Sequence, residues 1–128
     1  MPEYTSKEQL YDALNKMVAL LQADDAYKQR ISRADLTVAF TITDLSAEYT
    51  LKIVKGTLEG AVGTADGATF GAIMSSATLD KLLSGRLDGE SAYEMGAIRI
   101  RGSEWVAESA AGYVYSMVNA YKRATGQA

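Results

Sequence analysis

The spacing of hydrophobic residues changes at Asp35, and this change constrains the fold more than any other feature of the chain. Before Asp35, large apolar residues recur every three or four positions, which predicts an amphipathic helix that begins after Ser6. A shorter helical turn, capped by Asp24, follows it. From Leu36 to Ile42, large apolar residues occupy every second position, which predicts a half-buried strand. The chain therefore combines helices with a sheet.

Four segments with strand-like alternation follow one another closely after this change. Short turns join them, so they predict an antiparallel meander. The strands are 36–43, 48–53, 57–63 and 68–74, with turns at 44–46, at Lys55-Gly56 and at Asp66-Gly67.

The stretch from Leu79 to Gly102 predicts two short helices and a fifth strand. The first helix ends at Gly85, because glycine adopts the left-handed conformation that closes a helix. Asp88 can cap the second helix, and the strand leaves from Gly96. We expect this strand to pair in parallel with an early strand after a helical crossover.

Ser103 can cap one long final helix, whose apolar stripe runs from Val106 to Tyr121. Ala110-Ala111-Gly112 gives this helix a thin middle section, which implies close packing or room for something else. Strands grouped together with helices at both ends indicate an α+β fold with helices on one face of a twisted sheet.

The composition bounds the function. A chain of 128 residues with one proline is expected to form a single domain, 1–128, and a hydrophobic fraction of 48% argues against disorder. The 13 basic and 16 acidic residues are well mixed, so nothing indicates nucleic-acid binding. Without cysteine or histidine the chain lacks a thiol nucleophile, the usual general base at neutral pH and the commonest transition-metal ligand. We expect no metal and no cofactor.

No apolar run approaches the roughly 20 residues of a membrane span, and the start of the chain lacks the apolar centre of a signal peptide. The final residues are not a peroxisomal Ser-Lys-Leu signal. The sequence therefore predicts a cytoplasmic protein.

Two clusters suggest chemistry but have simpler interpretations. Five glycines lie among predicted strands rather than before a helix, which favours turns and bends over a phosphate loop: Gly56, Gly60, Gly63, Gly67 and Gly71. Four carboxylates lie close together in the central stretch, and helix caps or solvated faces explain them better than catalysis: Asp80, Asp88, Glu90 and Glu94. Methionines and tyrosines on several apolar stripes suit either a loose core or the wall of a cavity.

Three motifs in the central stretch carry a resemblance. They are Leu82-Leu83-Ser84-Gly85-Arg86, then Ser91-Ala92-Tyr93, then Gly96-Ala97-Ile98-Arg99-Ile100-Arg101-Gly102. In this order the motifs resemble the sterol carrier protein type 2 family of small, non-catalytic lipid-binding domains. The resemblance runs from about Phe40 through the last helix.

The resemblance implies a five-stranded, mostly antiparallel sheet covered on one face by helices, with an apolar tunnel between sheet and helices. It also implies that the chain binds and transfers a fatty acid, a fatty acyl-CoA or another lipid, with sterol less favoured, and that it is not an enzyme. The candidate ligand-binding residues are Phe40, Phe70, Met74, Leu79, Leu82, Leu83, Met95, Ile98, Val106, Tyr113 and Met117. Leu82, Leu83 and Met95 are expected to point inward.

Two other functions remain open from the sequence. The chain could be a small proton-transfer enzyme on a helix-plus-curved-sheet cone, with a buried carboxylate as its base. It could also be an interaction module that docks a lipid-handling enzyme through its Met- and Tyr-rich surface. Arg99 and Arg101 are interpreted as solvated charges, with transient contact to an anionic headgroup or membrane as the alternative. The oligomeric state and the position of the cavity mouth stay open.

Overall fold

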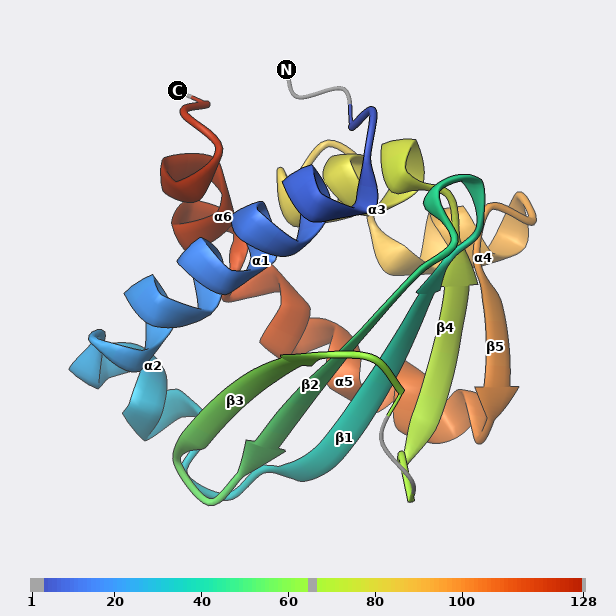
Figure 1. Ribbon diagram of the computed structural model, residues 1–128. Coiled ribbons are helices and arrows are strands. Elements are labelled where there is room, and N and C mark those ends of the chain that lie inside the picture. Colours follow the sequence, from blue (N-terminus) through green and yellow to red (C-terminus); the bar gives the residue numbers. More distant parts are fainter. Residues whose placement is uncertain (1–3, 65–66, 128) are drawn as a thin grey trace.

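The computed structural model describes residues 4–64 and 67–127, which form a five-stranded sheet with helices packed on one face (Figure 1). The predicted α+β class is confirmed. The elements are α1 (Lys7–Gln22), α2 (Asp25–Arg30), β1 (Asp35–Ile42), the short 3-10 helix η1 (Thr43–Leu45), β2 (Ala47–Val54), β3 (Thr57–Val62), β4 (Phe70–Met74), α3 (Ser76–Leu83), α4 (Gly89–Glu94), β5 (Arg99–Gly102), α5 (Glu104–Tyr115) and α6 (Val118–Ala124).

The strand order is β3-β2-β1-β4-β5, which differs from the predicted four-stranded meander. The meander ends at β3, and β4 lies on the other side of β1, parallel to it. The prediction that the fifth strand pairs in parallel is also wrong, because β5 pairs antiparallel with β4. Three strand spacings of about 4.8 Å separate β3 from β4, and the connecting residues 63–69 are long enough to cross them. Alternation along a strand predicts the strand but not its neighbours. Part of the turn expected at Asp66-Gly67 falls outside the described residues.

The register gathers the large apolar side chains on one face of the sheet. Val38 of β1 pairs with Leu51 of β2 and Phe70 of β4, and Phe40 pairs with Tyr49. Residues directly opposite one another point to the same side, so these side chains form one continuous apolar floor. The alternate positions point to the other side, where Lys52, Arg99 and Arg101 are exposed.

The predicted helix caps form as expected. The side chains of Ser6, Asp24, Asp88 and Ser103 each accept a hydrogen bond from a backbone N–H in the first turn of the following helix. Such caps satisfy donors that the helix itself leaves free. They fix where each helix starts and therefore how it meets the sheet.

The predicted single final helix is in fact two helices. Ser116 Oγ donates a hydrogen bond to the Gly112 carbonyl at 2.9 Å, a bond that bends helices, and the Met117 N–H bonds to Val114 three residues back. The helix tightens there and α6 leaves in a new direction. This break buries the Met117 side chain and brings α6 against α1.

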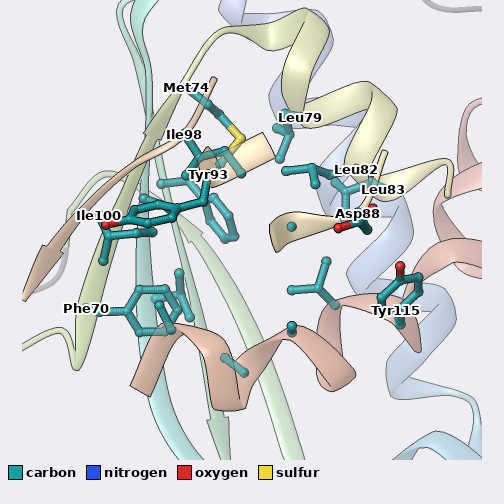
Figure 2. A pocket seen from close by; sticks show the side chains of 18 of the residues that line it. Phe70, Met74, Leu79, Leu82, Leu83, Asp88, Tyr93, Ile98, Ile100 and Tyr115 are labelled. Carbon is teal, nitrogen blue, oxygen red and sulfur yellow. The ribbon is translucent and has the colours of Figure 1, made fainter. Parts of the chain in front are cut away.

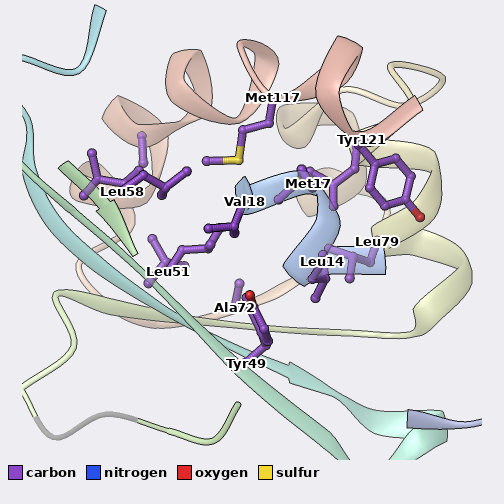
Figure 3. Packing of buried hydrophobic residues seen from close by; sticks show 14 of the residues in the cluster. Leu14, Met17, Val18, Tyr49, Leu51, Leu58, Ala72, Leu79, Met117 and Tyr121 are labelled. Atoms are coloured by element: carbon purple, nitrogen blue, oxygen red, sulfur yellow. The ribbon is translucent and has the colours of Figure 1, made fainter. Parts of the chain in front are cut away.

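The most solid part of the core lies between α1, α6 and the β2–β3 half of the sheet. Figure 3 shows Met17 and Val18 of α1 between the sheet residues Leu51 and Leu58 and the side chain of Met117. All five are buried. The other half of the sheet, under α3, α4 and α5, is packed differently.

Candidate functional site

A cavity of about 680 Å³ lies between the sheet and the helices α1, α3, α4 and α5 (Figure 2). This volume falls within the range of roughly 300–1,000 Å³ that is usual for small-molecule sites. Residues from the sheet, the loops and four helices line it: Leu14, Met17, Val38, Phe40, Tyr49, Leu51, Phe70, Ala72, Met74, Leu79, Leu82, Leu83, Leu87, Asp88, Gly89, Glu90, Tyr93, Glu94, Ile98, Ile100, Glu104, Ala107, Glu108, Ala110, Ala111, Val114, Tyr115 and Met117.

Small side chains on α5 explain why this half of the domain is hollow. Phe70 and Ile100 on the sheet and the leucines of α3 approach the space from two sides (Figure 2). On the third side α5 contributes Ala107, Ala110 and Ala111, whose methyl groups do not reach across. The thin section predicted in the last helix therefore leaves room on this side of the cavity.

The cavity opens between α4 and α5. Its exposed lining residues all come from positions 88–94 and from α5: Asp88, Glu90, Tyr93, Glu94, Glu104, Glu108 and Tyr115. The Tyr93 hydroxyl donates a hydrogen bond to Glu104 at 2.5 Å, which links the two helices across the opening. This bond to a carboxylate raises the pKa of Tyr93 above its ordinary value. The mouth thus has an acidic rim, while the inner wall is apolar.

Most of the predicted binding residues lie on the wall of this cavity. They are Phe40, Phe70, Met74, Leu79, Leu82, Leu83, Ile98 and Met117. Their contact with a ligand stays a prediction. The same stretch that carries the family motifs, Leu79 to Ile100, supplies much of the wall.

Three predicted residues, Met95, Val106 and Tyr113, do not line the cavity. The inward orientation expected for Met95 is wrong: this residue follows the last turn of α4 and is 69% exposed. Val106 and Tyr113 lie on α5 half-buried against the core, while Ala107, Ala110 and Val114 of the same helix face the space. Apolar residues cover a broad part of the α5 surface, so the helix could turn either set of residues toward the cavity. Spacing alone therefore does not decide which residues face inward.

Sequence reasoning missed several lining residues. Val38 and Ala72 occupy the same strand face as the predicted Phe40 and Phe70, and strict alternation would have included them. The small size of Ala110 and Ala111 indicates room beside the last helix, but spacing does not show that they line the wall. The interpretation of the acidic residues as caps and solvated charges does not predict their place on the rim.

Asp80 is the carboxylate that comes nearest to the catalytic alternative, because it is only 1% exposed. It accepts hydrogen bonds from the Tyr121 hydroxyl at 2.8 Å and from Arg86 Nη2 at 2.5 Å, and it does not line the cavity. These bonds connect α3 to α6 and to the segment that follows α3. Burial raises the pKa of its donor Tyr121 far above the ordinary value.

Residues 4–64 and 67–127 contain neither a metal-binding cluster nor a membrane-spanning helix. No group of three or more Asp or Glu side chains there is placed to hold a metal ion. Within the same ranges, no helix combines the length and the apolar character needed to cross a bilayer.

The fold and the cavity define a class: a small α+β domain in which helices close an apolar space over one half of a mixed sheet. Within this class, a sequence model of the SCP-2 sterol transfer family matches residues 14–112, and the chain belongs to this family. The resemblance inferred from the sequence motifs is confirmed. Family membership implies binding or transfer of lipids, generally by a non-catalytic domain.

Solved structures support the fold. The crystal structure of a sterol carrier protein 2 is 18% identical, with a TM-score of 0.64 over 86% of this chain and 93% of that one. A conserved hypothetical protein from Thermus thermophilus is 19% identical, with a TM-score of 0.66 over 85% of this chain and 83% of its own. No curated protein sequence matches the chain.

A larger enzyme contains a similar domain. The inverting sec-alkylsulfatase Pisa1 from Pseudomonas sp. is 22% identical, with a TM-score of 0.61 over 67% of this chain. The present chain spans only 14% of that protein, so the likeness concerns one domain of it.

Proposed function

We propose that the chain binds one hydrophobic molecule in the cavity and transfers it, without chemistry of its own. The observation that carries this proposal is the apolar cavity of about 680 Å³, which opens to solvent between α4 and α5. A space of this size lined by large apolar side chains is costly for a domain that does not fill it, because its walls lose packing contacts. An apolar ligand would restore those contacts.

The energetics of such binding are favourable. Burial of an acyl chain contributes about 0.8 kcal/mol per methylene, so sixteen carbons give on the order of 12 kcal/mol before costs. Association costs roughly 4 kcal/mol or more, which leaves affinities in the micromolar to nanomolar range. No charged contact is required for binding at this strength.

The kind of lipid and the location of the protein are also matters of proposal. The order of ligands inferred from the family, fatty acid and fatty acyl-CoA before sterol, is a prediction, and so is a cytoplasmic location. We also propose that residues 1–128 act as one lipid-binding domain. Trp105 and Met95, at 75% and 69% exposed, directly follow the rim residues Glu104 and Glu94 in the chain, and we propose that they contact a lipid surface during transfer.

The catalytic alternative is less well supported. Proton transfer would need an unpaired, buried carboxylate that faces the cavity. Among the described residues, the carboxylates on the cavity wall are exposed at its rim, and the buried Asp80 is paired elsewhere.

Three measurements test the proposal. Native mass spectrometry of the purified protein, and mass spectrometry of a solvent extract of a second sample, should each find a co-purified lipid. Its titration with the uncharged fluorescent dye Nile red should give saturable binding, and the protein should speed transfer of a fluorescent lipid between vesicles. A protein that carries no lipid, does not bind Nile red and does not accelerate transfer contradicts the proposal.

A further inference from the structure

The position of a ligand's polar end follows from the inner wall of the cavity. Away from the rim, aliphatic, aromatic and methionine side chains of the described residues form the wall, and the one hydroxyl among them, that of Tyr49, already donates to Asn15 at 2.8 Å. A polar head placed there would lose its hydration without gaining partners, which is costly. A chain-like ligand must therefore enter tail first and leave its head at the mouth between α4 and α5.

The mouth has one sign of charge. Five carboxylates lie on it, namely Asp88, Glu90, Glu94, Glu104 and Glu108, and no lysine or arginine lines the cavity in the described part of the chain. The side chains of Glu90, Glu94 and Glu108 form no ion pair with the described residues. Negative charges around the mouth repel an anionic head bound there and attract a cationic one.

The nearest basic side chains of the sheet face away from this opening. Ile100 of β5 lines the cavity, so Arg99 and Arg101, its chain neighbours, point to the opposite face. Both are exposed there. The alternative in which these arginines meet an anionic headgroup at the mouth therefore loses its geometric basis.

We infer that the cavity selects an apolar molecule with an uncharged or cationic head and discriminates against anionic amphiphiles such as fatty acids and acyl-CoA. This inference rests on the proposed function. The cavity is the site, and the carboxylates of the rim decide which head it accepts. The ligand order implied by the family is thereby changed for this chain.

A competition series tests the inference. Nile red bound to the protein is displaced at neutral pH and low ionic strength by three twelve-carbon competitors below their micelle concentrations: dodecanol, dodecylamine and dodecanoate. We expect dodecanoate to compete about tenfold less well than dodecylamine, because several like charges act together near a weakly screened surface. The difference should shrink at high salt, where the charges of the rim are screened.

A charge-matched pair of variants assigns the effect to the rim. Glu90→Gln/Glu94→Gln/Glu108→Gln removes three rim charges while leaving the cap Asp88 and the hydrogen-bonded Glu104 unchanged. The control removes three exposed carboxylates that do not line the cavity: Glu8→Gln/Asp35→Asn/Glu59→Gln. The rim variant should bring dodecanoate close to dodecanol, and the control should keep the original ratio.

The outcomes distinguish failure of head-group selection from failure of ligand binding. If dodecanoate displaces Nile red from the unchanged protein as well as dodecanol does, the inference is overturned while the binding function stands. Discrimination that survives in the rim variant, or disappears equally in the control, overturns the assignment to these carboxylates. If neither Nile red nor dodecanol binds, the proposed function itself fails.

Discussion

Two glycines illustrate how differently single positions are constrained. A Cβ at Gly60 of β3 would collide with the Tyr49 hydroxyl oxygen and lie 2.9 Å from Val18 Cγ2. Gly112 of α5 is exposed, and a Cβ there would meet nothing within 4 Å. Gly60 is thus needed for close packing, whereas Gly112 is a weakness of the helix.

We therefore expect opposite results from the same substitution. Gly60→Ala should lower the free energy of unfolding by about 1–3 kcal/mol, because Tyr49 and Val18 must move. Gly112→Ala should raise it by up to about 1 kcal/mol through helix propensity. Urea denaturation followed by circular dichroism measures both, and a Gly60→Ala protein as stable as the parent contradicts the packing at this strand.

Two buried tyrosines give a second contrast. The Tyr27 hydroxyl is buried without a hydrogen-bond partner among the described residues, while the Tyr49 hydroxyl donates to Asn15. Tyr27→Phe should stabilise the protein at neutral pH by about 1 kcal/mol, because an unsatisfied polar group is removed, and Tyr49→Phe should destabilise it by a similar amount. Loss of stability in both variants would show that Tyr27 has a partner.

The same tyrosines predict a loss of stability at alkaline pH. Burial raises the pKa of Tyr27 and of Tyr49 from 10.0 to about 12. The folded state therefore holds these protons more tightly than the unfolded state, and the stabilisation present below pH 10 is lost as the pH rises toward about 12. Either Phe variant should lose less stability across this window than the parent protein does. Denaturation at several pH values measures the slope.

At the scale of elements, Asp80 connects helices that are distant in sequence. Through the Tyr121 hydroxyl it joins α3 to α6, and Tyr121 in turn contacts the Tyr4 hydroxyl at 2.5 Å. Arg86, after the end of α3, pairs with the same carboxylate. The network fixes α3, which carries Leu79 and the other leucines of the cavity wall.

Asp80→Asn should lower the free energy of unfolding by about 2 kcal/mol, because the buried carboxylate loses its charge-assisted hydrogen bonds, while the attraction to the partly exposed Arg86 is screened by solvent. Tyr121→Phe, which removes hydrogen bonds but no charge, should cost about 2 kcal/mol. The control Asp12→Asn breaks the exposed pair with Lys16 and should change stability by about 0.5 kcal/mol or less. If chemical denaturation finds Asp80→Asn no worse than this control, the network does not hold α3.

Helices and strands could be predicted from local sequence signals, whereas their packing could not. The change of period at Asp35 and the caps Ser6, Asp88 and Ser103 are local signals, and each appears in the structure as expected. The place of β4 beside β1 depends on pairing between distant segments, which no local spacing encodes. The break at Ser116 depends on how α6 packs against α1.

At the scale of the whole molecule, the cavity could be predicted only from the resemblance to a family. The sequence pattern of Phe70 and Leu83 is that of core residues, and residues on the wall of a cavity have the same pattern. What makes the space is the combination of large side chains on the sheet with Ala107 and Ala110 on α5. Such a combination is visible only when the facing elements are known.

A substitution that fills the space tests whether the domain is hollow in solution. Ala110 is buried on the cavity wall, and Ala110→Phe would place a ring in the space rather than against packed atoms. We expect unchanged or slightly higher stability. The ring takes space from the ligand. If the ligand buries less apolar surface by the equivalent of about two methylene groups, it loses about 1.6 kcal/mol of binding free energy, so Nile red binding should weaken about tenfold or more. Thermal denaturation and dye titration measure the two effects on one sample.

Ala13→Phe is the matched control, because Ala13 is equally helical and buried but does not line the cavity. A ring forced into the packed interface of α1 should destabilise the protein by about 1–3 kcal/mol. Where this variant is folded, its affinity for Nile red should equal that of the parent. If Ala110→Phe is as destabilising as Ala13→Phe, the space under α5 is filled by side chains in solution, and the cavity cannot hold a ligand.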